Sequence, residues 1–235
     1  MGSIGRLGHV PTLTRRERLR ADTVAEIKQA ALDQIATQGA ASLSIRGIAR
    51  DIGMSPAGLY RYYDSLDTLI TELVTDTYTD LASTVETAVD RRESARARLR
   101  AGMHAYRDWS VADPHRFLLI FGTPIPGYTA PEGGPTEQAN RRIGAAFFGV
   151  ATDAHAHGEL AVDEPRRPPS PTEKAAAARF GADLPAAAVP ALVSAYAHFH
   201  GLVTLEILGQ LSWLYPQPDA FYAAEVEHIL DRLLR

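Results

Sequence analysis

Apolar residues recur every three or four positions along most of the chain, which is the period of an α-helix with one buried face. No segment alternates with the period of two that marks a half-buried strand. The pattern therefore predicts an all-α protein. The expected helices cover approximately residues 23–38, 45–52, 56–63, 65–89, 94–111, 114–121, 136–157, 174–179, 189–214 and 219–234.

Residues 44–63 predict two short helices joined by a tight turn. Ser44 and Ser55 are good N-caps, and each precedes a short helical run. Gly53 readily adopts positive φ and so ends the first of these helices. Pro56 occupies the first turn of the second helix, where its missing N–H has no intrahelical partner to lose. The result is a helix–turn–helix whose second helix carries Tyr60, Arg61, Tyr62 and Tyr63.

The alternative interpretation is a helical corner with tyrosines in the core. Leu59 and Tyr63 are expected to face the core in either case. Core packing does not require the cap–turn–cap sequence or the polar exposed positions, so DNA binding is the favoured interpretation. Hydroxyl groups and an arginine on a short helix suit contacts with phosphates and base edges in a major groove.

These residues resemble the TetR family of transcriptional regulators. The resemblance runs from about Val24 to Leu73 and includes the blocks SIRGIARDIGMS and LYRYY. Farther along, HFHGL at 198–202, followed by Leu205 and Glu206, is similar to the Trp-His-Gly motif of one subgroup, with Phe199 where tryptophan is usual. The resemblance implies an N-terminal three-helix DNA-binding domain and a larger C-terminal helical domain that binds a ligand and dimerises.

We expect a flexible basic arm over residues 1–22, the helix–turn–helix domain over 23–68, and the ligand-binding and dimerisation domain over 69–235. The arm either reaches phosphates or a minor groove or is a solubilising tail. The long helix 65–89 is the expected mechanical link, because a ligand that shifts its C-terminal part would change the separation of two recognition helices. The arginines of the expected arm are Arg15, Arg16, Arg18 and Arg20.

The predicted DNA contacts follow from the motif. Arg46, near the start of the first short helix, is the expected bidentate guanine contact. Pro56 and Ala57 are placed to touch thymine methyl groups, and Gly58 allows close approach of the helix. Arg61 belongs to the same surface. The predicted phosphate contacts are Ser44, Ser55, Tyr60 and Tyr62, with capping as the other role of the two serines.

The charge distribution supports this placement. The chain carries a net charge of −4 at pH 7, but residues 1–64 hold nine Lys and Arg against six Asp and Glu, whereas residues 65–235 hold fifteen against twenty-two. This asymmetry places a nucleic-acid surface in the N-terminal part. Leu66 stands where the family usually has a phosphate-contacting lysine, so that contact is expected to be lost.

Aromatic residues on several predicted helices are candidates for an apolar pocket with a few polar groups. The alternative is that they simply fill the core. The resemblance implies an effector site between these helices, and Tyr196 and His200 are the first choices for polar contacts. The full candidate set is Tyr106, Trp109, Phe117, Phe121, Phe147, Tyr196 and His200.

The last two predicted helices carry more apolar surface than one neighbouring helix can bury, which indicates a partner chain or a cavity. The resemblance implies that they pair with their symmetry mates in a four-helix dimer interface. The expected interface residues are Leu202, Leu205, Gly209, Tyr222, Val226, Ile229, Leu230 and Leu233.

Other chemistry is not indicated. The chain has no cysteine, which excludes disulfides and thiolate metal sites and fits a reducing cytoplasm. The histidine pairs at 155/157 and 198/200 are two residues apart and point to different helix faces, so no metal site is expected. No nucleophile motif or phosphate-binding glycine loop is present, so we expect neither catalysis nor a cofactor. We also expect no apolar run long enough to cross a bilayer.

The sequence thus predicts a cytoplasmic, homodimeric, ligand-responsive transcriptional regulator, in particular a repressor. It would bind a palindromic double-stranded DNA operator and be released by a small, largely apolar effector. The alternative is a small-molecule sensor or protein-interaction module of the same fold without specific operator recognition, which Leu66 and the acidic charge favour.

Overall fold

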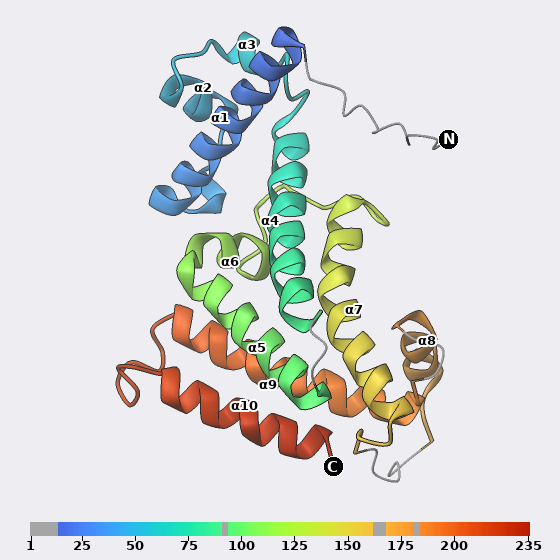
Figure 1. Cartoon of the computed structure of the whole chain (residues 1–235). Coiled ribbons are helices and arrows are strands. Elements are labelled where there is room, and N and C mark those ends of the chain that lie inside the picture. Colours follow the sequence, from blue (N-terminus) through green and yellow to red (C-terminus); the bar gives the residue numbers. More distant parts are fainter. Residues whose placement is uncertain (1–13, 91–93, 162–167, 181–183) are drawn as a thin grey trace, which may run out of the picture. The chain divides into compact units, whose positions relative to one another are not determined.

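The computed structural model describes residues 14–90, 94–161, 168–180 and 184–235 (Figure 1). Over these ranges the chain forms helices and no strand, with one isolated bridge between Leu160 and Leu234. The predicted all-α class is confirmed. The chain divides into two compact units, Met1–Leu69 and Ile70–Arg235.

The first unit holds the first four elements of the chain and the start of α4. These elements are α1 (Arg15–Gln38), η1 (Ala40–Ser42), α2 (Ile45–Asp51), α3 (Pro56–Leu59) and the first turn of α4 (Leu66–Val89). The second unit holds the rest of α4 together with α5 (Ala95–Ala112), α6 (Pro114–Phe121), α7 (Pro135–Ala156), α8 (Pro171–Phe180), η2 (Ala186–Ala188), α9 (Val189–Ile207) and α10 (Asp219–Leu233).

Helix α1 begins at Arg15 rather than at the predicted Thr23. A capping box starts it, because the Glu17 N–H donates to Thr14 Oγ1 at 3.2 Å and the Thr14 N–H donates to Glu17 Oε2 at 2.7 Å. The arginines at 15, 16, 18 and 20 therefore lie in a helix, and placing them in a flexible arm was wrong. The rest of the expected arm, residues 1–13, lies outside the described residues.

Helices α9 and α3, unlike α1, are shorter than predicted. Helix α9 ends at Ile207 instead of 214, because Gly209 adopts φ 68° and its N–H donates to the Glu206 carbonyl at 2.9 Å. Helix α3 ends at Leu59 instead of 63, because the Tyr62 N–H turns back to the Leu59 carbonyl at 2.9 Å in a tighter i→i+3 bond. Helix α8, by contrast, extends on both sides of the predicted 174–179.

The second unit is organised around α5, which packs against α6, α7, α9 and α10. Its residues Leu99, Met103 and Tyr106 are at most 2% exposed. Helix α9 lies alongside both α5 and α10, and contributes Phe199 and Val203 to the same core. Burial of such large apolar side chains supplies the main stabilising free energy of this unit.

The apolar stripe of α10 faces this core. Its members are no more than 4% exposed in the single chain, so they cannot present surface to a partner subunit. Their predicted role in a dimer interface was wrong, because the one apolar face of α10 is already covered by α5 and α9. The residues concerned are Tyr222, Val226, Ile229, Leu230 and Leu233.

The expectation about bilayer-length apolar runs was also wrong. The stretch Ala186–Ile207 has a mean hydropathy of 1.3 and is long and apolar enough to cross a membrane by length and composition alone. In the structure this stretch is mostly α9, which packs against α5, α8 and α10. Core helices of globular proteins pass the same test, so the run carries no membrane assignment.

A buried ion-pair network joins three helices of the second unit. Arg107 on α5 is 6% exposed and donates to both carboxylate oxygens of Glu206 on α9, at 2.7 and 2.6 Å. It also donates to Asp219 at the start of α10, at 3.0 Å. These bonds, with Glu206 first, raise the pKa of Arg107 above its ordinary value, so the guanidinium stays charged. Charged groups are rarely buried unless they are paired in this way.

We predict that Arg107→Met lowers the free energy of unfolding by about 3 kcal/mol, because it leaves the Glu206 carboxylate, which is only 16% exposed, without its partner. Denaturant titration measures this change. The control is Arg100→Met, whose partner Glu227 is 41% exposed, and we expect a loss below about 1 kcal/mol there. Equal losses in the two variants would contradict a special role for the buried pair. In the double variant Arg107→Met/Glu206→Met, most of the lost stability should return.

Candidate nucleic-acid interface and ligand cavity

Helices α2 and α3 form a helix–turn–helix with the predicted caps. The Ser44 side chain accepts from the Gly47 N–H at 3.1 Å, and the Ser55 side chain accepts from the Gly58 N–H, also at 3.1 Å. Between the helices Gly53 adopts φ 65°, which L side chains rarely occupy. The connection from Asp51 to Pro56 is therefore only four residues long.

The two faces of this motif differ sharply. Ile48, Ala49 and Leu59 are fully buried, and Tyr63 is 2% exposed. The nine predicted DNA-contacting residues all lie away from that core. Seven of them are exposed, namely Ser44, Arg46, Ser55, Pro56, Ala57, Tyr60 and Arg61, and Gly58 and Tyr62 are half-buried. The structure thus places all nine predicted residues in the first unit, and none of them is buried.

One half-buried member of that set has an unexpected partner. The guanidinium of Arg20 on α1 lies 5.0 Å from the centre of the Tyr62 ring, a cation–π contact. Arg20 had been assigned to the arm, so the sequence interpretation did not connect it with the tyrosine. The missed signal is the capping box at Thr14 and Glu17, which extends the helix through Arg20.

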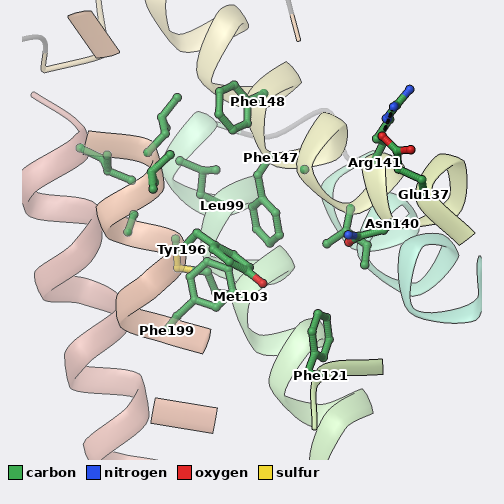
Figure 2. A pocket seen from close by; sticks show the side chains of 16 residues that line it. Leu99, Met103, Phe121, Glu137, Asn140, Arg141, Phe147, Phe148, Tyr196 and Phe199 are labelled. Atoms are coloured by element: carbon green, nitrogen blue, oxygen red, sulfur yellow. Dashed lines mark hydrogen bonds and ion pairs between the residues drawn. The ribbon is translucent and has the colours of Figure 1, made fainter. Parts of the chain in front are cut away.

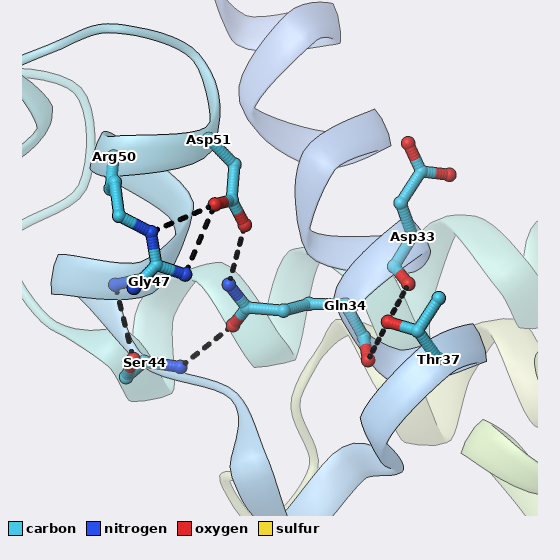
Figure 3. A network of polar contacts seen from close by, with 7 residues as sticks. All are labelled: Asp33, Gln34, Thr37, Ser44, Gly47, Arg50 and Asp51. Atoms are coloured by element: carbon cyan, nitrogen blue, oxygen red, sulfur yellow. Dashed lines mark hydrogen bonds and ion pairs between the residues drawn. The ribbon is translucent and has the colours of Figure 1, made fainter.

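A second unexpected residue is Gln34, which holds α2 at both ends (Figure 3). Its side chain is buried on α1, donates to Asp51 Oδ2 at 3.0 Å and accepts from the Ser44 N–H at 3.3 Å. The Gln34 amide, and then the Arg50 guanidinium, hold the pKa of Asp51 below its usual range. A polar residue in the buried stripe of Ile27, Ala31 and Ile35 was the available signal for this contact.

Gly47 provides the room for this network. A Cβ at position 47 would lie 2.5 Å from Gln34 Nε2 and 2.9 Å from Ser44 Oγ. A larger residue would therefore push the amide out of its hydrogen bonds with Asp51 and Ser44. Because residue 47 has no side chain, Gln34 keeps the hydrogen bonds that hold α2 in place, and α2 carries Arg46.

The second unit contains a cavity of about 380 Å³ (Figure 2). Its walls come mainly from α5, α7 and α9, with Phe121 of α6 and Leu233 of α10 completing them. The lining is largely apolar and aromatic, as in most small-molecule sites. Glu137, Asn140 and Arg141 add a polar group on α7.

The structure places three of the seven predicted ligand contacts in the cavity wall, namely Phe121, Phe147 and Tyr196. Sequence analysis did not assign Met103, Phe199 or the three polar residues of α7 to the site. Helical periodicity shows that a side chain is covered but cannot distinguish a core contact from a cavity wall.

The other four predicted contacts lie outside the lining. Tyr106 and Phe117 are fully buried in the core. The Tyr106 hydroxyl is 2.7 Å from His200 Nδ1, and burial raises the pKa of Tyr106 and lowers that of His200. The Trp109 indole N–H donates to Asp80 at 2.8 Å instead of facing the cavity.

Comparison with protein families supports the division of the chain. The family model for bacterial regulatory proteins of the tetR family matches residues 27–73. The model for the tetracyclin repressor-like C-terminal domain matches residues 99–229. The first match covers the helix–turn–helix, and the second covers the unit that contains the cavity.

Individual proteins are similar to this chain over most of its length. The chain is 34% identical over 200 residues to the HTH-type transcriptional regulator Rv1816 of Mycobacterium tuberculosis (strain H37Rv), covering 83% of this chain and 85% of that protein. The crystal structure of the proposed regulatory protein SCO4313 superposes with a TM-score of 0.73 at 35% identity, covering 93% of this chain and all of that one. A Rhodococcus sp. RHA1 protein of unknown function shares the fold, with a TM-score of 0.69 at 22% identity, covering 90% and 95% of the two chains.

We predict that Gly47→Ala destabilises the natural sequence more than it destabilises a Gln34→Ala background. In the natural sequence it should lower the free energy of unfolding by about 1–2 kcal/mol, because the new methyl group displaces the Gln34 amide from its hydrogen bonds. In a Gln34→Ala background the same change should cost less, because only the 2.9 Å contact with Ser44 Oγ remains and alanine is the better helix former. Thermal and urea unfolding measure both, and destabilisation of similar size in both backgrounds would contradict the role given to Gln34.

Proposed function

The chain belongs to the TetR family of transcriptional regulators, and from that premise we propose that it is a repressor released from DNA by a small molecule. It binds a palindromic operator as a homodimer, and a small, largely apolar effector in the second unit lowers its affinity for that operator. The observation that carries the proposal is the exposed face of the helix–turn–helix, where every predicted DNA contact is accessible or half-buried.

Arg46 is the proposed base-reading residue. Its side chain is exposed on α2 and makes no hydrogen bond or ion pair to any residue that the structure describes, so its guanidinium is available to a guanine. Arg50, one turn later, is instead bonded to Asp51 at 3.1 Å. The exposed Pro56 and Ala57 at the start of α3 offer apolar contact to thymine methyl groups.

Capping and phosphate binding are compatible at the two serines. Each hydroxyl oxygen accepts a backbone N–H from its own helix, which leaves its O–H free to donate. A phosphate oxygen near Ser44 or Ser55 would take that proton in a hydrogen bond. Tyr60 and Arg61, both exposed, supply further donors on the same unit.

We assign the dimer interface to the C-terminal part of α9 and the turn that follows it. Four of the eight large, exposed apolar side chains among the described residues lie between 205 and 214, outside the cavity lining. Leu208 is 50% exposed and Trp213 is 81% exposed, which is unusual for residues that stay in contact with water. Leu202, Leu205 and Gly209 from the predicted interface belong to this region, and the buried stripe of α10 does not.

The cavity and the DNA-binding unit communicate through α4 in this proposal. Phe121 lines the cavity, and its ring centre lies 5.7 Å from that of Tyr78 on α4, in an edge-to-face contact. The Tyr78 hydroxyl also donates to the Ile120 carbonyl at 2.9 Å, and burial raises the pKa of Tyr78 to about 12. A ligand that moves Phe121 therefore acts on a helix that continues without interruption to Leu66.

Several narrower assignments complete the proposal. We propose that the second domain belongs to the Trp-His-Gly subgroup, on the similarity of the HFHGL segment at 198–202 to that motif. The protein acts in the cytoplasm and carries out no catalysis, and its function needs no cofactor or metal. We place the start of the DNA-binding domain at α1, that is near Arg15 and not at residue 23, and keep its expected end near residue 68.

The test of this function is selection of bound sequences from a random duplex library by the purified protein at two salt concentrations. The proposal requires recovery of a palindrome whose half-sites lie about one helical turn, or ~34–36 Å, or a related spacing apart. Recovery of sequence-indifferent, salt-sensitive binding alone would instead support a sensor or interaction module of the same fold.

We predict that Arg46→Ala weakens binding to the selected operator by about 5- to 150-fold, the equivalent of one bidentate base contact of ~1–3 kcal/mol. Affinity for random DNA should change little, because phosphate contacts dominate there. Fluorescence anisotropy with both duplexes measures this difference. Arg50→Ala is the matched control on the same helix and should alter both affinities equally and weakly. A variant at position 46 that keeps the natural preference for the operator would remove Arg46 from base reading.

A further inference from the structure

Three of the four polar side chains of the cavity, Glu137, Asn140 and Arg141, lie together at one end (Figure 2), and we propose that its ligand is an organic acid. An apolar, ring-bearing body would occupy the aromatic part, and its carboxylate would lie at Arg141 and Asn140. The role of this ligand as an effector rests on the proposed function, whereas its binding to the cavity does not.

The aromatic part suits a flat apolar body. Met103 and Phe199 lie on one side and Phe147 reaches in from α7, while Phe121 closes the lower end in the view of Figure 2. Burial of an apolar body against these side chains provides the main favourable free energy of binding. None of these side chains selects for charge, so the charge preference of the site depends on its polar end.

The polar end comes from the first two turns of α7. Glu137, Asn140 and Arg141 are spaced i, i+3 and i+4, so they share one face of the helix, and they lie together at one side of the cavity. The Tyr196 hydroxyl is the remaining polar side-chain group of the lining.

The carboxylate of Glu137 is already engaged. One oxygen accepts from Arg141 and the other accepts from the Gly133 N–H at 2.9 Å. Arg141, and then Gly133, lower the pKa of Glu137, so it stays ionised and its charge is compensated. A cationic ligand would have to compete with Arg141 for this group.

Donors, by contrast, remain available. A guanidinium has five N–H donors, and the bond to Glu137 uses one of those on Arg141. The Asn140 side chain makes no hydrogen bond to another described residue. The group also lies near the N-terminus of a 22-residue helix whose N-cap, Gly134, provides no side-chain cap, so the local dipole favours an anion.

The exposure of this end fits a charged head group. The Arg141 side chain is 43% exposed, so a carboxylate paired with it keeps part of its hydration. Complete burial of the ligand charge would be far more costly. The apolar part of the cavity would thus hold the apolar body of the ligand, and the water-exposed end at Arg141 would hold its carboxylate.

The test uses three compounds that share one aromatic body: 2-naphthylacetate, its primary amide and 2-(2-naphthyl)ethylamine. Isothermal titration calorimetry of the full chain without DNA measures their affinities. We expect the acid to bind about tenfold more tightly than the amide, as for a charge-assisted hydrogen bond, and the amine to bind most weakly. Equal affinities, preference for the amine, or no binding of any of the three would overturn the inference.

Two variants test the residues with opposite expected signs. Arg141→Gln should weaken binding of the acid about tenfold. Glu137→Gln should strengthen it about two- to fivefold, because it removes a like charge and a competitor for Arg141. The control is Arg142→Gln, since Arg142 pairs with Glu86 and does not line the cavity. If Arg141→Gln strengthens binding of the acid and Glu137→Gln weakens it, the site prefers cations. If neither variant changes the affinity for the acid, the site does not respond to charge. Either result would contradict the proposal.

These outcomes are separate from those of the proposed function. If the acid binds with the expected signs and operator affinity does not respond, the ligand class stands and the effector role fails. If the operator is recognised but none of the naphthyl compounds binds, the regulator stands and the ligand class fails.

Discussion

The arrangement of the second unit depends on the burial of one guanidinium. Among the described residues, Arg107 is the only charged side chain in the buried class, and it must be compensated where it lies. Glu206 and Asp219 provide that compensation from α9 and α10, and the Tyr222 ring packs against the guanidinium with its centre 5.2 Å away. A shift of either helix relative to α5 would break a charged hydrogen bond, so the network fixes the helices that line the cavity and carry the exposed apolar surface.

The N-terminal unit is fixed by a separate set of contacts. Gln34 bonds to both ends of α2, and the two serine caps set where α2 and α3 begin. Neither set of contacts includes residues of the other unit, and the continuous element between the units is α4. Under the proposed function, ligand information travels from the cavity through Phe121 and Tyr78 to this helix.

Local signals in the sequence were sufficient for the helix–turn–helix. Ser44, Gly53 and Ser55 act within three residues of their own positions, so their roles follow from composition and spacing. The capping box at Thr14 was equally local but was overlooked. The stripe of α10 shows the limit of such signals, because periodicity reveals that a face is buried and not which chain buries it. The bond between Arg107 and Glu206 joins residues 99 positions apart, and no local pattern reports it.

The proposed function requires one chain both to bind a specific DNA sequence and to respond to a small molecule. The most direct measurement is the affinity of the protein for its selected, fluorescently labelled operator with and without saturating 2-naphthylacetate, with occupancy of the cavity verified by calorimetry. Typical coupling free energies of ~1–3 kcal/mol predict a loss of operator affinity of about 5- to 150-fold. If the operator affinity stays the same while the cavity is occupied, the proposed release from DNA by a small molecule is contradicted.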